Sequence, residues 1–128
     1  MSNNQLIMTM DKKLIYIAGA LRGEIPEYIG NVSKMIKHAE KIRRLGFAVY
    51  IPCLDILQGV VMGDLSFKDY FDNSYEILKR CDAVSLVPGF EKSNGVKEEI
   101  EEADSRGIPV LETEADLLDY SLELSPPF

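Results

Sequence analysis

The sequence predicts an α/β fold, a doubly wound and mostly parallel sheet of four to five strands with helices on both faces. Three observations predict it. Short apolar runs alternate along the chain with longer stretches whose apolar residues recur at helical spacing. The apolar runs are continuous, which is typical of strands that are covered on both faces in a parallel sheet. The connections between these segments are short and contain most of the Gly and Pro residues.

The first part of the chain predicts one strand-helix-strand unit. Residues 13–19 form an apolar run closed by glycine, which we interpret as the first strand. Pro26 opens a helix at its first turn, and apolar residues recur at helical spacing until Gly46 stops it. Residues 47–52 form the second strand, because the proline at its end cannot extend the ladder. A right-handed crossover makes these two strands parallel.

The second part of the chain begins with a segment that lacks a clear period. Residues 53–67 carry apolar side chains among glycines and aspartates, and we expect either a lid over an apolar ligand face or a subunit contact. A helix capped by Ser66 or Ser74 then runs through Arg80. The remaining elements are expected as a strand over 82–87, a helix over 94–106, a strand over 108–111 and a short helix over 115–120. Such an alternation is Rossmann-like or flavodoxin-like.

Size and charge limit the classes of function. A chain of 128 residues with 46% hydrophobic residues fits one domain over 1–128, with residues 1–11 and 121–128 as loosely ordered tails. The net charge of −7 argues against binding a long nucleic acid, which needs a broad basic field. Binding of a small phosphorylated ligand is compatible with this net charge, because backbone N–H groups and one arginine can hold a phosphate locally.

The cysteines, the single histidine and the lack of a long apolar run indicate which compartment and which cofactors to expect. Cys53 and Cys81 lie without metal spacing beside predicted strands, so we expect free, buried thiols in a reducing cytoplasm. No apolar run reaches membrane-spanning length and the N-terminus lacks the order of a signal peptide, so we expect a soluble protein without a membrane partner. The single histidine, His38, is expected on the surface, and no ligand cluster implies a metal or an organic cofactor.

The stretch from Leu86 to Ile100 carries the predicted site. It contains a strand end, a loop and the start of a helix, and ligands bind in such crevices, where helix N–H groups attract anions. Val96, Ile100 and Ala103 define the buried stripe of this helix, and Glu99 lies roughly 60° from Val96 at its flank. The remaining three glutamates point to solvent, where they complement the helix dipole. They are Glu98, Glu101 and Glu102.

A lone cation accompanies this loop. Arg22 follows the first strand, and the ends of the first and third strands would bring it into one crevice with the Ser93-Asn94-Gly95 loop. The alternative is a solvated loop charge.

Three motifs together resemble the nucleoside 2-deoxyribosyltransferase-like superfamily, which includes deoxynucleoside 5′-monophosphate N-glycosidases and uncharacterised bacterial and phage relatives. They are Tyr16-Ile-Ala-Gly-Ala-Leu-Arg22-Gly23, Cys81-Asp82-Ala-Val, and Pro88-Gly-Phe-Glu-Lys-Ser93-Asn-Gly95-Val-Lys-Glu-Glu99 followed by Ala103 and Gly107-Ile-Pro-Val. The resemblance spans residues 13–111. It implies an enzyme that cleaves or transfers the N-glycosidic bond of a (deoxy)nucleoside or its 5′-monophosphate.

The resemblance also implies roles for single residues. Glu99 falls on the nucleophile that attacks C1′ of the sugar, giving a glycosyl ester that water or a second base releases. Tyr16 falls on a tyrosine that orients this carboxylate, and its alternative role is a core aromatic. The residues that match the phosphate-binding loops are Gly19, Arg22, Gly23, Ser93 and Gly95, with Asn94 inside the second loop.

The chain departs from the family pattern at one position. Ser74 stands where the family usually carries the aspartate that assists departure of the base. Asp72 is the nearest carboxylate, but it is rotated about 200° around the helix, so it would serve only if the helix starts later or shifts register. Asp55 is another candidate.

Other functions and an assembly also remain open. A nucleotide-binding module that senses or sequesters its ligand without turnover is the main alternative, and a purely structural domain is the third. Relatives in the superfamily are commonly dimers or larger, with residues of a neighbour closing the site. The apolar segment 54–65 and the Pro-Pro-Phe tail are compatible with such a contact, so we expect a homo-oligomer.

Overall fold

The computed structural model describes residues 12–21, 25–63 and 67–124. Within these ranges the elements are β1 (Leu14–Ala18), α2 (Ile25–Arg44), β2 (Ala48–Tyr50), α3 (Cys53–Met62), α4 (Phe67–Leu78), β3 (Ala83–Leu86), the 3-10 helix η1 (Phe90–Lys92), α5 (Asn94–Ser105), β4 (Val110–Leu111) and α6 (Glu114–Glu123). Strands and helices alternate as the apolar pattern predicts.

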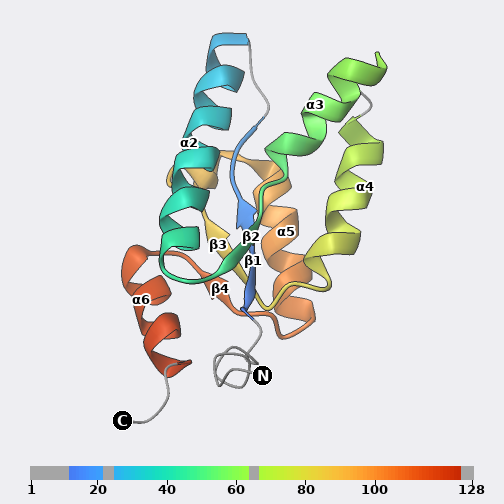
Figure 1. Cartoon of the computed structure of the whole chain (residues 1–128). Coiled ribbons are helices and arrows are strands. Elements are labelled where there is room, and N and C mark those ends of the chain that lie inside the picture. Colours follow the sequence, from blue (N-terminus) through green and yellow to red (C-terminus); the bar gives the residue numbers. More distant parts are fainter. Residues whose placement is uncertain (1–11, 22–24, 64–66, 125–128) are drawn as a thin grey trace, which may run out of the picture.

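The described strands form one sheet in the order β2-β1-β3-β4, and every neighbouring pair is parallel. The chain steps from β1 to the edge strand β2, returns across β1 to β3, and continues to β4. Helices cover both faces of this sheet (Figure 1). The predicted doubly wound, Rossmann-like fold is confirmed, with four strands, all parallel.

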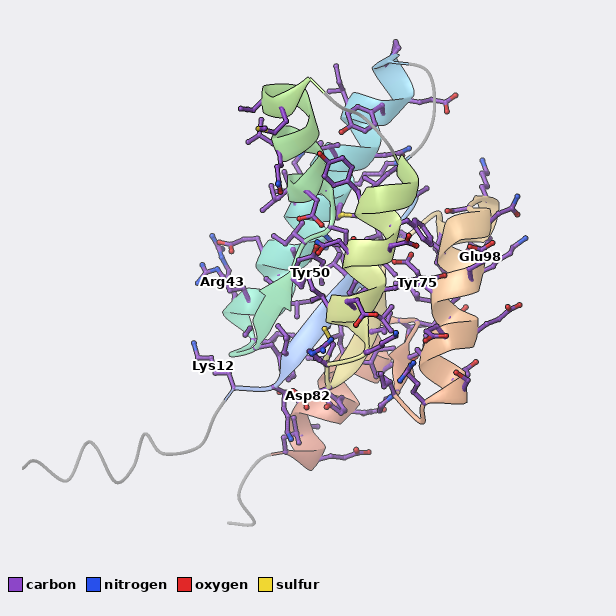
Figure 2. The ribbon with its side chains drawn as sticks, turned by 90° about the vertical axis from the view of Figure 1, so that its right-hand side faces the viewer. Lys12, Arg43, Tyr50, Tyr75, Asp82 and Glu98 are labelled. Atoms are coloured by element: carbon purple, nitrogen blue, oxygen red, sulfur yellow. The ribbon has the colours of Figure 1, made fainter. Side chains whose placement is uncertain are left out.

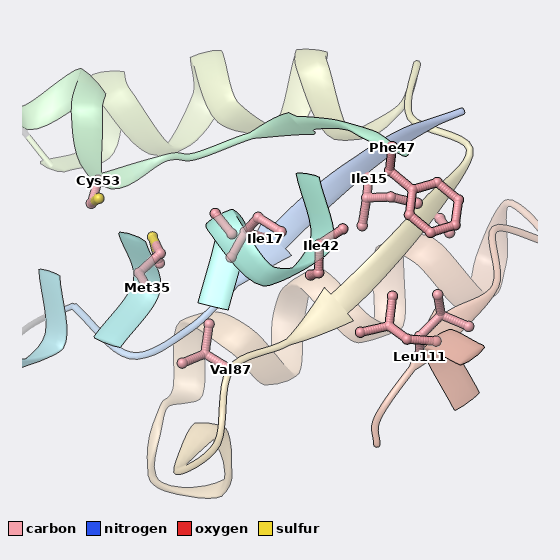
Figure 3. Packing of buried hydrophobic residues seen from close by; sticks show 11 residues of the cluster. Ile15, Ile17, Met35, Ile42, Phe47, Cys53, Val87 and Leu111 are labelled. Carbon is pink, nitrogen blue, oxygen red and sulfur yellow. The ribbon is translucent and has the colours of Figure 1, made fainter. Parts of the chain in front are cut away.

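The first core lies between the sheet, α2 and α6. Ile15 and Ile17 of β1 point to this face and pack with Met35 and Ile42 of α2 (Figure 3). Leu117 of α6 belongs to the same cluster. The apolar stripe that predicted a helix after Pro26 is therefore the stripe that covers the sheet.

The second core lies between the sheet, α4 and α5. Tyr16 and Ala18 point to this face, because neighbouring side chains of a strand alternate between its two sides. They pack with Leu78 of α4 and with Val96 and Ala103 of α5. Tyr16 therefore directs its hydroxyl toward the helices that carry most of the candidate site residues.

The first ten residues of the segment 53–67 form the helix α3, and the lid or subunit contact expected for this segment stays a prediction. Cys53 is buried at its start, whereas Leu57 and Val61 are exposed. Among the α3 side chains that the structure describes, apolar residues lie on the exposed side as well as at the buried start, which is why the helical period is hard to recognise. Residues 64–66 lie outside the described part of the chain.

Two helix boundaries also differ from expectation. Ser74 lies inside α4 and does not cap it, since the helix already begins at Phe67. The last helix continues to Glu123, so residues 121–123 are helical and do not belong to a loose tail. Its start is fixed by a capping box in which Thr113 accepts from the backbone of Asp116.

His38 is not an ordinary surface residue, which corrects the sequence interpretation. It is half-buried, and its Nε2 lies 2.9 Å from the Oγ of Ser85 on β3. Ser85 is fully buried in the sheet and needs a partner, and the ring of His38 supplies it. Burial lowers the pKa of His38, and the charge of Lys41 acts in the same direction.

Candidate functional site

A cavity of about 930 Å³ opens at the carboxyl ends of β1 and β3. The chain leaves β1 toward one edge of the sheet and leaves β3 toward the other, so this is the point where the strand order reverses. Ligands of doubly wound folds bind at this point. Its walls come from the first turns of α2, from α4, and from the loop and helix that follow β3.

The pair Tyr16 and Glu99 lines this cavity. The Tyr16 hydroxyl of β1 donates a hydrogen bond to Oε2 of Glu99 on α5. Only 1% of Tyr16 and 6% of Glu99 is exposed, so the bond lies in a nearly dry environment. Because polar groups out of water need partners, this contact satisfies a carboxyl that the fold of α5 would otherwise bury alone.

Burial changes the acid-base behaviour of both groups. Desolvation raises the pKa of Glu99 to about 7, against a smaller lowering by the Tyr16 hydrogen bond, and the nearby charge of Glu98 raises it further. Desolvation also raises the pKa of Tyr16 well above its usual value, and the neighbouring Glu99 adds to this. At neutral pH the Tyr16 phenol is therefore protonated, whereas Glu99 changes its charge near pH 7.

The other glutamates of α5 have different surroundings. Glu98 and Glu101 are exposed, and Glu102 is paired with Arg106 at 2.8 Å. Figure 2 shows Glu98 on α5 and Tyr75 on the neighbouring α4. Burial raises the pKa of Tyr75 to about 12, with the α5 carboxylates adding to it. Glu99 is the buried glutamate of α5, in agreement with its helical phase.

The loop before α5 brings backbone close to the cavity. Ser93 caps the helix, because its Oγ accepts from the backbone N–H of Val96 at 3.2 Å. A Cβ at Gly95 would lie 3.2 Å from the ring of Phe71 on α4, so the glycine allows the helix start to approach that ring. The first turn of α5 therefore lines the cavity, and a helix N-terminus is a place where an anion can bind.

Gly19 is required at the end of β1 for a similar reason. A Cβ there would lie 2.8 Å from Cγ2 of Val87, which is closer than real side chains approach. Val87 donates its backbone N–H to Ala18, so the two strand ends are held together. The missing side chain lets β1 and β3 stay adjacent where the cavity opens.

The structure brings most of the predicted site residues to one cavity. Its lining includes Tyr16, Gly19, Asp72, Ser74, Ser93, Asn94, Gly95 and Glu99. Asp72 and Ser74 both reach the cavity although they are two positions apart on α4, and Asp72 is exposed whereas Ser74 is buried. Arg22 and Gly23 lie outside the described residues.

Sequence reasoning missed the wall that α2 contributes. Glu27, Asn31 and Lys34 line the cavity from this helix, and Lys92 lines it from η1. The three α2 residues stand at i, i+4 and i+7, which places them on one face of the helix. This polar stripe beside the apolar stripe of α2 is the sequence signal that could have indicated the wall. Lys34 and Lys92 are exposed cations beside an otherwise acidic site.

A second polar group lies behind the cavity. Asp55 of α3 accepts a hydrogen bond at Oδ2 from the Tyr50 hydroxyl, and the Oγ of Ser74 donates to the same oxygen at 3.4 Å. The Tyr16 and Tyr50 rings are 5.6 Å apart between centroids. Asp55 does not line the cavity. It was considered from sequence as a proton donor, and the structure connects it to the site through Ser74.

Both cysteines lie in the described part of the chain, and neither forms a disulfide there. Cys53 and Cys81 are free and buried, as predicted, and burial raises the pKa of each thiol to about 11. Among the described residues no three His, Cys, Asp or Glu side chains are grouped so that they could hold a metal ion. In the same part of the chain no helix is long and apolar enough to cross a bilayer.

Comparison with known proteins identifies a family without an assigned role. A family model described as a domain of unknown function (DUF4406) matches residues 13–112. No curated protein and no solved structure matches the chain.

Proposed function

This chain belongs to the DUF4406 family, and from its cavity we propose that it cleaves or transfers the N-glycosidic bond of a (deoxy)nucleoside or its 5′-monophosphate. The observation that carries the proposal is the buried carboxyl of Glu99, which accepts a hydrogen bond from Tyr16 beside an open cavity. A carboxylate held in this way suits attack on an electron-poor sugar carbon. The resemblance of the sequence to nucleoside 2-deoxyribosyltransferase-like enzymes points to the same chemistry.

The proposed reaction has two displacement steps at C1′ of the sugar. Glu99 attacks C1′ as the C1′–N bond breaks, and the bonding electron pair leaves with the base, which takes up a proton. Water, or a second base, then attacks C1′ and releases the Glu99 carboxylate. Tyr16 holds the carboxylate in place throughout, because its hydroxyl stays protonated at neutral pH.

The state of Glu99 gives this reaction a defined pH dependence. Only the ionised form is a nucleophile, and its pKa is raised to about 7. The ionisation of Glu99 should therefore make the rate rise as the pH increases through 7. Binding of an anionic substrate would move this rise to higher pH, because a second negative charge favours the protonated form.

The rest of the cavity offers groups for the two ends of the substrate. The N-terminal turn of α5 after Ser93 presents backbone N–H groups, and Lys34 and Lys92 supply positive charge, so a phosphate would bind at this end. Asp72 lines the wall formed by α4 and is the carboxyl that we propose to protonate the leaving base. No metal or organic cofactor is part of this proposal.

Base release tests the proposal directly. Purified protein is incubated with a panel of nucleosides and 5′-monophosphates, and free base is measured by chromatography. We expect release from at least one compound and a loss on the order of a thousandfold or more in Glu99→Ala. Glu98→Ala is the matched control, because Glu98 is the exposed neighbour on the same helix. No release from any compound, with wild type and Glu99→Ala alike, would refute the proposal.

A binding module without turnover is the second candidate. It is favoured by Ser74, a buried hydroxyl at a position where the resembling enzymes carry a carboxyl. In that case a monophosphate should raise the melting temperature of wild type and of Glu99→Ala equally, while Arg22→Ala abolishes the shift. Base release by the wild type would exclude this function.

We also propose that the protein acts as a homo-oligomer in the cytoplasm. The side chains of Leu54, Leu57, Val61 and Met62 on α3 are between 53% and 75% exposed and form an apolar face on one helix. A second copy of the chain would bury this face at low cost in desolvation. The free thiols of Cys53 and Cys81 fit a reducing compartment.

A further inference from the structure

Phe71 is an aromatic residue of the cavity wall that takes no part in the two cores. On α4, Phe71 precedes the buried Ser74 and Leu78 by one and two helical turns, on the same face of the helix. This inward face therefore continues from the second core to the cavity, where Phe71 is half-buried and lines the wall. Among the described residues, Phe71 belongs to neither core cluster. Its ring is an apolar surface beside an open cavity, which is what small-molecule sites offer a ligand.

The Phe71 ring has close neighbours on two helices. A Cβ at Gly95 would lie 3.2 Å from its Cε2, so the start of α5 packs directly against the ring. On α4, the ring centroid of Tyr75 lies 4.8 Å from that of Phe71, at an interplanar angle of 59°. Figure 2 shows Tyr75 on α4 beside α5. These neighbours restrict the motion of the ring, and a ring that is already ordered binds a planar ligand at a lower entropic cost.

The place of this ring fits the geometry of the proposed reaction. Gly95 and Glu99 stand at i and i+4 on α5, so they share one face of the helix and lie about 6 Å apart along its axis. The Phe71 ring contacts the position of Gly95, so it lies about one helical turn from the carboxyl that would attack C1′. Because the base is bonded directly to C1′, a sugar at Glu99 would bring its base beside Phe71. Asp72, which we propose to protonate that base, is the next residue of α4 and also lines the cavity.

We propose that the base of the substrate stacks on Phe71, so that the cavity selects N-glycosides with a planar aromatic base. This inference rests on the proposed function, which defines the sugar at Glu99 and the base that leaves it. Every nucleobase has a π face that can stack on an aromatic side chain. Stacking on Phe71 therefore favours purines and pyrimidines alike over a sugar phosphate that carries no base.

Binding without turnover tests this role. The variants are made in Glu99→Gln protein, so that the ligands stay intact, and affinities are measured by calorimetry. The ligands are the 5′-monophosphates of the base-release panel and 2-deoxyribose 5-phosphate, which lacks a base. We expect Phe71→Leu to weaken binding of the nucleotides about tenfold and to leave binding of the sugar phosphate unchanged. Phe71→Tyr keeps an aromatic face and should retain the affinity for nucleotides.

Phe90→Leu is the matched control. Phe90 is also half-buried, but it packs against the second core and is not among the described residues that line the cavity. The change should leave both affinities unaltered. Far-ultraviolet circular dichroism confirms that each variant is folded.

Carbon-13 NMR of labelled phenylalanine rings gives a direct readout of the contact. The chain has five phenylalanines, and the signal that disappears in Phe71→Leu identifies Phe71. This signal should shift when a nucleotide is added and stay in place when 2-deoxyribose 5-phosphate is added.

Several results would overturn the proposal, even if the wild type releases base. Equal weakening of both kinds of ligand by Phe71→Leu would show that the ring only supports the wall. An unchanged nucleotide affinity in Phe71→Leu, or a loss as large in Phe71→Tyr, would show that no base stacks on it. Failure of every monophosphate to bind would also overturn it. Conversely, nucleotide binding that depends on Phe71 would uphold the proposal even if the wild type releases no base, so the two assays give separate answers.

Discussion

At the residue scale, Glu99 and the other glutamates of α5 carry the same carboxyl group but differ in their surroundings. The exposed Glu98 remains in water, whereas Glu99 is 6% exposed and has a phenol as its partner. Removing a carboxylate from water costs free energy, and one hydrogen bond recovers only part of it. The protein thus retains a group that is unfavourable when charged, which is a feature of reactive sites.

This cost predicts how stability depends on pH. The pKa of Glu99 is raised from 4.5 to about 7 in the folded state, so folding binds a proton between these values, and the free energy of unfolding falls as the pH rises through them. Glu99→Gln removes the charge and keeps the shape and the acceptor for Tyr16. At pH 8 we expect the free energy of unfolding, measured with urea, to be higher than that of wild type by up to about 3 kcal/mol. At pH 4 the two proteins should have similar free energies of unfolding. An equal difference at both pH values would contradict this explanation, and Glu98→Gln is the control.

At the element scale, the start of α5 is a capped helix end that also lines the cavity. Ser93 caps the helix through the N–H of Val96, and Gly95 allows it to pack on Phe71. Thr113 caps α6 in a comparable way on a helix that contributes nothing to the cavity. The two caps therefore form a matched pair, one at the site and one away from it.

Removing each cap separately should distinguish the effect on helix stability from the effect on phosphate binding. Ser93→Ala and Thr113→Ala should each lower the free energy of unfolding by about 1 kcal/mol. Only Ser93→Ala should also weaken binding of a 5′-monophosphate, measured by calorimetry, because it loosens the N–H groups that would hold the phosphate. Equal affinities in the two variants would place the phosphate elsewhere.

The individual elements also show how much of the structure could be predicted from the sequence, and why. Strands such as residues 13–19 and helices such as α2 were recognisable because their apolar residues follow one period and pack inward. α3 was not, because its apolar face turns outward. Glu99 was singled out from helical phase and motif position, and its burial on α5 agrees with that phase. The hydrogen bond from Ser74 to Asp55 was not predicted, because it depends on how α3 and α4 sit beside the sheet.

At the scale of the whole molecule, the exposed face of α3 is the feature that a single copy of the chain does not explain. Leu57 is 64% and Val61 75% exposed, on a helix with one charged residue. The protein carries a net charge of −7, so association has to overcome mutual repulsion through apolar contact. A dimer through this face would leave the cavity of each copy at the end of its own sheet.

Sedimentation tests this arrangement. Wild type at micromolar concentration should sediment as a species heavier than the 14.4 kDa chain, and Leu57→Lys should sediment as a single chain. Leu122→Lys is the control, because Leu122 is similarly exposed, at 70%, but lies on α6. A monomeric wild type, or dissociation by the α6 change alone, would rule out the α3 contact.

The central claim is that the Glu99 carboxylate forms a covalent bond with the sugar, and intact-protein mass spectrometry tests it most directly. The protein is mixed with the compounds of the base-release panel and quenched in acid within milliseconds to seconds. We predict an added mass equal to the sugar, or the sugar phosphate, on wild type, located on Glu99 by peptide mapping and absent from Glu99→Gln. Base release without any adduct, undiminished in Glu99→Gln, would contradict the account.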